Sequence, residues 1–375
     1  MTAIADILRH EMAPGPLPWV RFMELALYHP QHGYYERSAS VIGKAGDFYT
    51  SVSVGSLFGE LLAYRFRQWL KDIARPVILE AGAHDGRLAL DILRALDHPQ
   101  VQVFEYWIVE PSPTRQSWQH KVLADFAPRI RWFSDEQALA KESVTGIVFA
   151  HELLDALPCQ RLGWDARARR WFEWGVQWRP DRFEWVRLPW PGSPKMEAWP
   201  AALLEILPDA FTIELCPAAE RWWTTMAGRL KTGCLLTFDY GLETEEFLQP
   251  HRAQGTLRSY HQHRLVADVL ANPGLQDITA MVDFTAVRTA GENAGLTTVG
   301  FETQSRFLTR IVRELWETGG SPWPPQKTRQ FQTLTHPDHL GRAFHVLVQA
   351  TPDHFNKASI ADANLKSRPL MPPTS

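Results

Sequence analysis

The segment "VILEAGAHDGRLALDIL" (residues 77–93) predicts how this chain of 375 residues begins its central sheet. A short apolar run ends in small residues, and "RLALDIL" after the turn has the apolar spacing of a helix. Gly82 and Gly86 flank the turn, so the backbone there can approach a ligand that faces the N-terminus of the following helix. The segment therefore predicts a parallel strand, a glycine-rich binding turn and a covering helix.

Further apolar runs follow at residues 102–112, 145–158 and 233–241, and the intervening segment 113–127 has helical spacing. Strands that alternate with helices predict an α/β fold with a parallel sheet covered on both faces. Residues 297–304 and 343–350, with a helical segment between them, are expected to close the sheet as a final pair of strands.

The regions outside this alternation divide the chain into parts. The predicted parts are a helical N-terminal region (1–74) with a long loop (33–55), a sheet domain (75–352) with insertions at about 159–210 and 243–290, and a disordered tail (353–375).

The first insertion alternates aromatic and polar residues over 159–190, which predicts two or three antiparallel strands. Its interleaved Arg and Trp residues also resemble a platform for single-stranded nucleic acid. We favour a packed face formed by Trp171, Trp174 and Trp178, with solvated arginines around it.

Composition argues against several classes of protein. The chain is 45% apolar and 22% charged with a formal net charge of −3, so no basic field indicates a nucleic-acid partner. No apolar run approaches the roughly 18 residues of a membrane helix, and the N-terminus has no apolar signal core. Cys159, Cys216 and Cys234 lie far apart, which predicts a reducing compartment. We therefore expect a cytoplasmic protein without membrane insertion.

Acidic residues end the first two predicted strands. Glu80 ends the first, and Glu110 ends the second about 30 residues later, where an acid typically receives ribose hydroxyls. This pattern fits either a dinucleotide or S-adenosylmethionine. The spacing E-x-G-x-x-x-G departs from the dinucleotide pattern, which makes a pyrophosphate site the weaker of the two.

The third apolar run ends in "HELLDALP" (151–158), which at first sight resembles a zinc-protease helix. Such a motif needs two ligands one helical turn apart, and the second position here is Asp155. The pairs His261/His263 and His336/His339 also lack the expected spacing of a downstream ligand. We therefore expect no metal.

Nine blocks, in the right order along nearly the whole chain, resemble the MidA-like family of S-adenosylmethionine-dependent methyltransferases. The blocks are "FMELALYHPQHGYY" (22–35), "GKAGDFYTSVSVGSLFGELL" (43–62), "LEAGAHDGRLALDIL" (79–93), "AHELLDALP" (150–158), "IELCP" (213–217), "GCLLTFDYG" (233–241), "GTLRSYHQH" (255–263), "NPGLQDITAMVDF" (272–284) and "GRAFHVLVQ" (341–349). The mitochondrial member of that family is a complex I assembly factor that acts as a protein arginine methyltransferase. The resemblance implies a class I methyltransferase-like fold: a doubly wound, mostly parallel seven-stranded sheet, a helical N-terminal addition and inserted antiparallel strands.

The resemblance also implies a function and roles for residues. The implied reaction transfers a methyl group from S-adenosylmethionine to a protein arginine. Glu152 and Asp155 are the catalytic candidates, because carboxylates hold a planar guanidinium through charge-assisted hydrogen bonds. The loop 33–55 is expected to cover the cofactor. Residues expected to bind the cofactor are Gly46, Asp47, Phe48, Thr50, Ser51, Glu80, Gly82, His84, Gly86, Leu88, Glu110, Pro111 and His151. Residues expected on the substrate side are Asp239, Tyr240, Arg258, Tyr260 and Asp283. The analogy further implies a protein partner, such as a respiratory-complex subunit, and allows a homodimer.

The chain departs from the family pattern at two places. The usual turn E-x-G-P-G-x-G has a middle glycine where this chain has His84, and the usual Pro-Glu is replaced at Val52-Ser53. A histidine tolerates positive φ better than most residues, but its ring needs room. Two alternatives therefore stay open: an assembly or binding factor that keeps the fold without catalysis, and a small-molecule methyltransferase whose pocket is lined by the Trp-rich insertion.

Overall fold

The computed structural model describes residues 2–37, 50–98, 104–190, 192, 199, 201–261, 264–338 and 340–354. Among these residues, no helix is both long and apolar enough to cross a bilayer.

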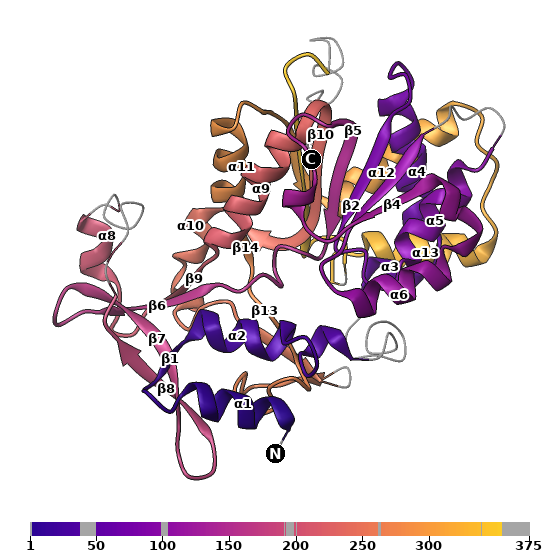
Figure 1. Ribbon diagram of the computed structural model, residues 1–375. Helices are drawn as coiled ribbons and strands as arrows, with labels where there is room; N and C mark the ends of the chain where they lie inside the picture. Colours follow the sequence, from indigo (N-terminus) through magenta and orange to yellow (C-terminus); the bar gives the residue numbers. More distant parts are fainter. Residues whose placement is uncertain are drawn as a thin grey trace.

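A mostly parallel sheet of seven strands lies at the centre of the molecule (Figure 1). In spatial order the strands are β15 (Thr297–Thr303), β16 (Phe344–Ala350), β10 (Leu230–Leu242), β5 (Val144–His151), β2 (Val77–Ala81), β3 (Glu105–Val109) and β4 (Ile130–Phe133). Strand β16 runs antiparallel to both of its neighbours, and the other pairings are parallel. The predicted seven-stranded sheet and its closing pair are confirmed. Two short strands of this sheet were not predicted: β4 at one edge, and β14 (Val282–Asp283), which pairs in parallel with the end of β10.

Helices cover both faces of this sheet because its central strands are apolar on both sides; every residue of β2 is buried. One face packs against α4 (Leu57–Leu70), α5 (Arg87–Leu96), α12 (Gln304–Glu317) and α13 (Pro325–Thr335). The other face packs against α9 (Pro217–Arg229) and α11 (Phe284–Asn293). The sheet is thus the doubly wound architecture expected from the sequence.

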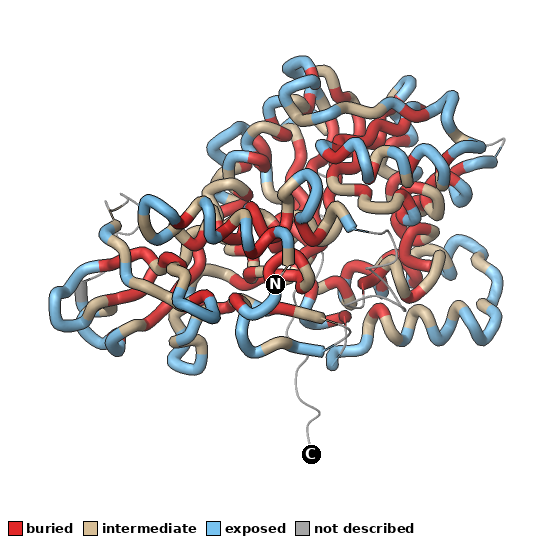
Figure 2. Tube along the Cα trace, turned by 60° about the horizontal axis from the view of Figure 1, so that its bottom comes forward, coloured by how far each residue is buried: buried red, intermediate tan, exposed pale blue. Residues whose placement is uncertain are grey.

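A second layer lies below the carboxyl ends of the sheet strands (Figure 1). It contains the helices α1 (Ala3–Glu11), α2 (Trp19–Tyr28) and η1 (Tyr34–Glu36), and the strands β1 (Leu17–Pro18), β6 (Gln160–Asp165), β7 (Arg170–Trp178), β8 (Phe183–Leu188) and β9 (Thr212–Leu215). The insertion therefore forms three consecutive antiparallel strands, and β1 of the N-terminal segment pairs with β7, the middle strand of the three. Buried residues (red) occur in this layer as well as in the sheet layer (Figure 2).

Trp171 does not share a face with the other two tryptophans of β7, so the expectation of a single packed face is wrong. Successive strand residues alternate between faces, and three positions separate Trp171 from Trp174. Trp171 packs on Trp164, at 5.3 Å between ring centroids, whereas Trp178 packs on Phe183 at 4.9 Å.

The second insertion adds a small sheet that also faces the carboxyl ends of the main strands. Its strands are β11 (Arg258–His261), β12 (Arg264–Leu265) and β13 (Asp277–Thr279), with β11 in the middle. The remaining helices are α3 (Ser51–Val54), α6 (Pro113–Val122), η3 (Ala124–Arg129), η4 (Glu136–Ala138), α8 (Ala201–Ile206), α10 (Thr244–Phe247) and η5 (Pro250–Arg252).

Candidate active site

A cavity of about 880 Å³ opens where the two layers meet. Its sheet side is formed by residues at and just after the carboxyl ends of β2, β3 and β5. Its other side includes Tyr28, Tyr35 and Glu36, which belong to the N-terminal part of the second layer (residues 2–37, called the N-terminal layer below). A crevice outside the carboxyl ends of the strands is the usual ligand site of a doubly wound sheet.

The glycine-rich turn after β2 forms part of the cavity wall. Gly82, His84 and Gly86 all have positive φ, at 73°, 44° and 84°. A side chain at Gly82 would meet Leu153, because an added Cβ would lie 3.0 Å from Leu153 Cδ1. His84 fits its left-handed position: its carbonyl accepts a hydrogen bond from Gln119 Nε2 at 3.0 Å, and its ring lies 5.8 Å from that of Trp118. The substitution for glycine therefore leaves the turn intact.

Glu80 is the second-last residue of β2, and its buried side chain is part of the cavity wall. Burial raises the pKa of Glu80 to about 8, and the Tyr106 hydroxyl, which donates to Oε2 at 2.6 Å, offsets only part of this rise. The Glu80 carboxyl is therefore mostly protonated at neutral pH, so it can itself donate a hydrogen bond.

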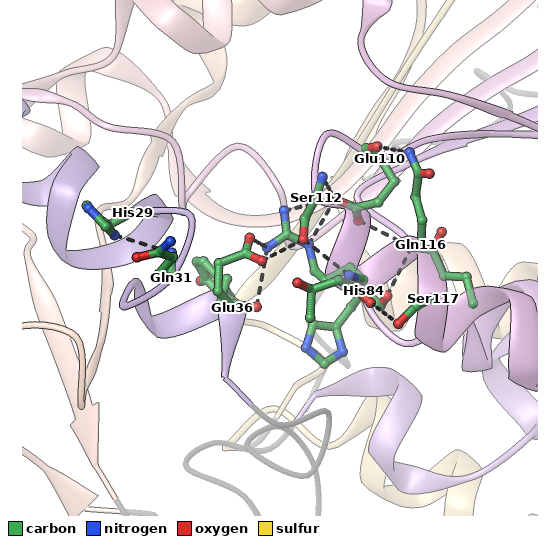
Figure 3. A network of polar contacts seen from close by, with 12 residues as sticks. His29, Gln31, Glu36, His84, Glu110, Ser112, Gln116 and Ser117 are labelled. Carbon is green, nitrogen blue, oxygen red and sulfur yellow. Dashed lines mark hydrogen bonds and ion pairs between the residues drawn. The ribbon is translucent and has the colours of Figure 1, made fainter.

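Glu110 follows β3 at the centre of a polar network (Figure 3). Its Oε1 accepts from the Ser112 backbone N–H at 3.0 Å and from Arg115 Nε at 2.9 Å, while Oε2 accepts from Gln119 Nε2 at 3.2 Å. Arg115 also binds Glu36 Oε1 at 3.0 Å, and the Ser112 hydroxyl donates to Glu36 Oε2 at 2.6 Å. The network thus joins the sheet side of the cavity to the N-terminal layer.

Glu152 is held in a strained backbone conformation at the end of β5. Its φ is 51°, and its N–H donates to the Phe238 carbonyl at 2.9 Å. Left-handed conformations in large residues cluster at functional sites, where the surrounding structure imposes them. The Glu152 side chain reaches the cavity wall, and its Oε1 has no hydrogen-bond partner among the described residues.

Burial raises the pKa of Glu152 well above its usual range, and repulsion from Asp239 and Asp277 raises it further. Burial acts in the opposite direction on the neighbouring His151, whose pKa falls to about 3, so its imidazole is neutral at physiological pH. His151 Nε2 lies 3.5 Å from Glu152 Oε1, and it has no hydrogen-bond partner within the described parts of the chain. Two buried polar atoms without a hydrogen-bond partner in the described part of the chain thus lie together, on two residues that line the cavity.

Three further buried carboxyl groups, those of Asp155, Asp239 and Asp277, lie near Glu152. Asp239 accepts from the N–H groups of Leu154 and Tyr240 at 2.8 and 2.9 Å, yet burial raises its pKa to about 7. Burial and the charge of Asp239 together raise the pKa of Asp155 well above the usual range, because two adjacent buried carboxylates repel one another. The third, Asp277 of β13, accepts from the Tyr35 hydroxyl at 2.7 Å. A cation brought to this cluster would relieve the repulsion.

The structure distributes the expected site residues between the wall and its surroundings. Those that line the cavity are Thr50, Glu80, Gly82, His84, Leu88, Glu110, Pro111, His151 and Glu152. Those that lie outside its wall are Ser51, Gly86, Asp155, Asp239, Tyr240, Arg258, Tyr260 and Asp283. Gly46, Asp47 and Phe48 fall outside the described residues.

Several of the residues outside the wall have clear structural partners. The Ser51 hydroxyl donates to Gln304 Oε1 at 3.1 Å, and Gly86 is the N-cap residue of helix α5, in a left-handed conformation. Asp283 caps helix α11 and accepts from the Thr244 hydroxyl at 2.8 Å. Burial raises the pKa of the Tyr240 hydroxyl. The charge of Glu152 raises this pKa further, and the charge of Arg258 in β11 lowers it.

Sequence reasoning missed Asp277, Tyr35, Glu36 and Arg115. Asp277 and Tyr35 lie inside blocks that carried the resemblance, but nothing in the pattern brings the two blocks together. Arg115 had a local signal: Ser112 and Pro113 predict a helix start, which places Arg115 in the first turn beside Glu110.

The residues of the wall suit a nucleoside joined to an amino acid. Glu110 offers an acceptor for ribose hydroxyls, apolar groups of Leu88, Val109 and Pro111 offer a surface for a base, and the glycine turn allows close approach. Among the described residues, no group of three or more His, Cys, Asp or Glu side chains is arranged to hold a metal ion.

Comparison with known proteins agrees with this geometry. The model of a family of S-adenosyl-L-methionine-dependent methyltransferases matches residues 59–302. The chain is 28% identical to the homolog of the mitochondrial protein arginine methyltransferase NDUFAF7 from Drosophila melanogaster, over 90% of this chain and 82% of the relative. It is 26% identical to the human protein of that name, over 91% of this chain and 82% of the relative.

A solved structure shows the same architecture with a ligand. A COG1565 superfamily member from Burkholderia thailandensis, bound to S-adenosyl-homocysteine, is 32% identical to this chain. The match covers 93% of this chain and 92% of that protein, with a TM-score of 0.82.

These relatives overturn the expected cytoplasmic location, because the curated proteins are named as mitochondrial. The expectation rested partly on dispersed cysteines, which indicate a reducing compartment without saying which one. The fold, the cavity and the matched family model agree, and the chain belongs to the family of S-adenosylmethionine-dependent methyltransferases.

Proposed function

We propose that this methyltransferase modifies an arginine nitrogen of a protein substrate. The observation that carries the proposal is Glu152 in the cavity wall, whose buried Oε1 has no hydrogen-bond partner among the described residues, together with the nearby carboxyl groups of Asp155, Asp239 and Asp277. A guanidinium is planar, stays protonated and binds carboxylates in a bidentate manner. The names of the curated relatives as protein arginine methyltransferases support the same acceptor.

Different residues of the cavity wall bind the cofactor and the acceptor. When bound, S-adenosylmethionine supplies an electrophilic methyl group on a sulfonium. Glu80, the glycine turn and Glu110 hold the cofactor on the sheet side. Glu152 binds the guanidinium and fixes one nitrogen in line with the methyl group, which is the main source of rate in a displacement of this kind.

Glu152 also has the properties of a proton acceptor. Methyl transfer to a guanidinium nitrogen gives a methylguanidinium that is still cationic, so one proton must leave that nitrogen. Entry of the cationic substrate favours the charged form of Glu152. After transfer, the raised pKa of Glu152 favours uptake of the proton at Oε1, the oxygen without a partner among the described residues.

The nature of the partner follows from the acceptor. We infer a protein substrate, with a respiratory-complex subunit as a candidate by analogy with the family, and a homodimer as a further prediction. A nucleic-acid partner is not favoured, because arginines of the insertion already have acidic partners, such as Arg187 with Asp209 at 3.2 Å.

The test is Glu152→Gln, assayed with isotopically labelled S-adenosylmethionine and arginine-containing substrates, with methylarginine identified by mass spectrometry. We expect kcat to fall about 100-fold or more, because Gln can neither carry the charge nor accept the proton. Affinity for S-adenosylhomocysteine should change less than about threefold, since Glu152 is placed on the substrate side. Glu173→Gln is the matched control: burial raises the pKa of Glu173 too, but Glu173 lies in the insertion and outside the cavity wall.

Unchanged arginine methylation by Glu152→Gln would contradict the proposal. Label found only on a small molecule would assign the site to the small-molecule class. A wild-type protein that binds S-adenosylhomocysteine but labels no acceptor would favour the binding factor without catalysis.

A further inference from the structure

We propose that Arg115 is a positioning residue that fixes the Glu110 carboxylate for the ribose of the cofactor and couples it to Glu36 in the N-terminal layer. The inference rests on the proposed cofactor role of Glu110.

The hydrogen bonds around Glu110 divide its two oxygens into different roles. Oε1 accepts hydrogen bonds from the Ser112 N–H and from Arg115 Nε, and Arg115 Nη2 lies 2.8 Å from the same oxygen as an ion-pair contact. Among the described residues, only Gln119 Nε2 donates to Oε2. A carboxylate oxygen has two lone pairs, so Oε2 keeps acceptor capacity while Oε1 is saturated. The arrangement therefore presents one defined oxygen to a hydroxyl in the cavity.

The Arg115 guanidinium, itself part of the cavity lining, holds this arrangement. Its side chain is 10% exposed, and its remaining nitrogen, Nη1, donates to Glu36 Oε1 at 3.0 Å and to the Tyr35 carbonyl at 3.3 Å. Glu36 is fixed a second time by the Ser112 hydroxyl, as Figure 3 shows. Both Glu36 and Glu110 line the cavity. One buried cation thus sets the positions of two cavity acids that lie about 75 residues apart in the chain.

Variants of Arg115 and Glu36 can test whether Arg115 only neutralises the two acids or also fixes their positions. Arg115 carries one positive charge against the two carboxylates of Glu36 and Glu110, so the cluster has a net charge of −1 when both acids are ionised. The double variant Arg115→Met/Glu36→Gln keeps this net charge but removes the ion pairs that hold Glu110 in position. Lysine at position 115 keeps the charge but cannot reproduce the planar fork that reaches both acids.

The experiment measures equilibrium binding of S-adenosylhomocysteine and of its analogue with a 2′,3′-dideoxyribose. The wild-type protein should bind the dideoxy analogue at least about tenfold more weakly, since a hydrogen bond to a charged group is lost. In Arg115→Met, affinity for S-adenosylhomocysteine should fall about tenfold, whereas affinity for the analogue should change less than about twofold. The charge-matched double variant should likewise lose affinity for S-adenosylhomocysteine but not for the analogue. Arg115→Lys should show the same selective loss of affinity, but a smaller one than Arg115→Met.

Arg65→Met is the matched control for stability. Arg65 is similarly buried, at 11% exposure, and pairs with Glu314 at 2.8 Å, but α4 does not line the cavity. Its substitution should lower thermal stability without a selective loss of either ligand.

Each outcome has a defined meaning. Equal losses for both ligands in Arg115→Met, or full recovery in the charge-matched double variant, would overturn the positioning role. Equal wild-type affinity for the two ligands would instead show that Glu110 does not bind the ribose, which is a failure of the proposed cofactor site. If Arg115→Met does not fold, Arg115→Lys decides the same comparison.

Discussion

His84 replaces a family glycine in the glycine-rich turn after β2, and its backbone adopts the left-handed conformation that glycine favours. Its φ of 44° carries a cost for a residue with a side chain, although histidine bears it better than most. The ring contact with Trp118 and the hydrogen bond from Gln119 to the His84 carbonyl offset part of this cost.

We expect His84→Gly to leave the free energy of unfolding unchanged or to raise it by up to about 1 kcal/mol, because relief of strain offsets the greater freedom of the unfolded chain. Ala83→Gly, in the same turn but without positive φ, should instead lower it by about 0.5–1 kcal/mol. Urea denaturation of both variants measures this contrast. A large loss of stability in His84→Gly would mean that the ring, rather than the backbone, determines the turn.

Glu80 predicts a pH dependence of stability in the protein without cofactor. Its pKa rises from an ordinary value of about 4.5 in the unfolded chain to about 8 in the folded protein. The folded state therefore holds a proton that the unfolded state releases, and the resulting stability is present below pH 4.5 and is lost as pH rises through 8.

In Glu80→Gln this part of the pH dependence should be absent. Between pH 6 and pH 9, the free energy of unfolding of the wild type should fall by at least about 1 kcal/mol more than that of the variant. Denaturation at the two pH values measures the difference, and Glu105→Gln on the neighbouring strand, an exposed acid, should behave as the wild type. Parallel pH profiles for wild type and Glu80→Gln would contradict the raised pKa.

At the scale of elements, helix α3 is fixed to α12 by a fully buried hydrogen bond from Ser51 to Gln304. The sequence led us to expect the Ser51 hydroxyl beside the cofactor. In the structure this hydroxyl instead donates a hydrogen bond to Gln304 Oε1. Leaving that buried oxygen without a donor would cost folding free energy.

We expect Ser51→Ala to destabilise the protein by about 1–3 kcal/mol, the cost of leaving a buried acceptor unsatisfied. A double-mutant cycle with Gln304→Met, read by denaturation, should give a coupling of about 1 kcal/mol. Strictly additive effects of the two substitutions would show that this hydrogen bond does not stabilise the contact.

The elements that the sequence predicted well are those whose signal is local. Apolar runs, glycines and helical spacing identified β2, β3, β5, β10, β15 and β16, the turn with Gly82 and the position of Glu110. The acidic cluster was only partly predicted, because Asp277 reaches it through the pairing of β11 with β13, and strand register is not visible in a single sequence. Glu36 and Arg115 were missed because their ion pair depends on how the N-terminal layer docks against the sheet, which is also not visible in a single sequence.

At the scale of the whole molecule, the cavity belongs to both layers. The sheet supplies the turn, Glu110 and Glu152, and the N-terminal layer supplies Tyr35 and Glu36. Aromatic packing holds the N-terminal layer to the inserted strands, as where Trp19 lies 5.0 Å from Trp185 between ring centroids. Alternation of strands and helices predicts the sheet layer, but it gives no information on what covers the carboxyl ends of the strands.

The most direct test of the central claim is calorimetric titration of the purified wild-type protein with S-adenosylhomocysteine. We expect saturable binding at one site per chain, with a Kd of roughly 1–100 μM, as for ordinary enzyme ligands. The heat capacity change should be negative, because apolar surface is buried in the cavity. A folded protein that gives no saturable heat, and no rise in Tm at millimolar ligand, would contradict the claim that this cavity is a cofactor site.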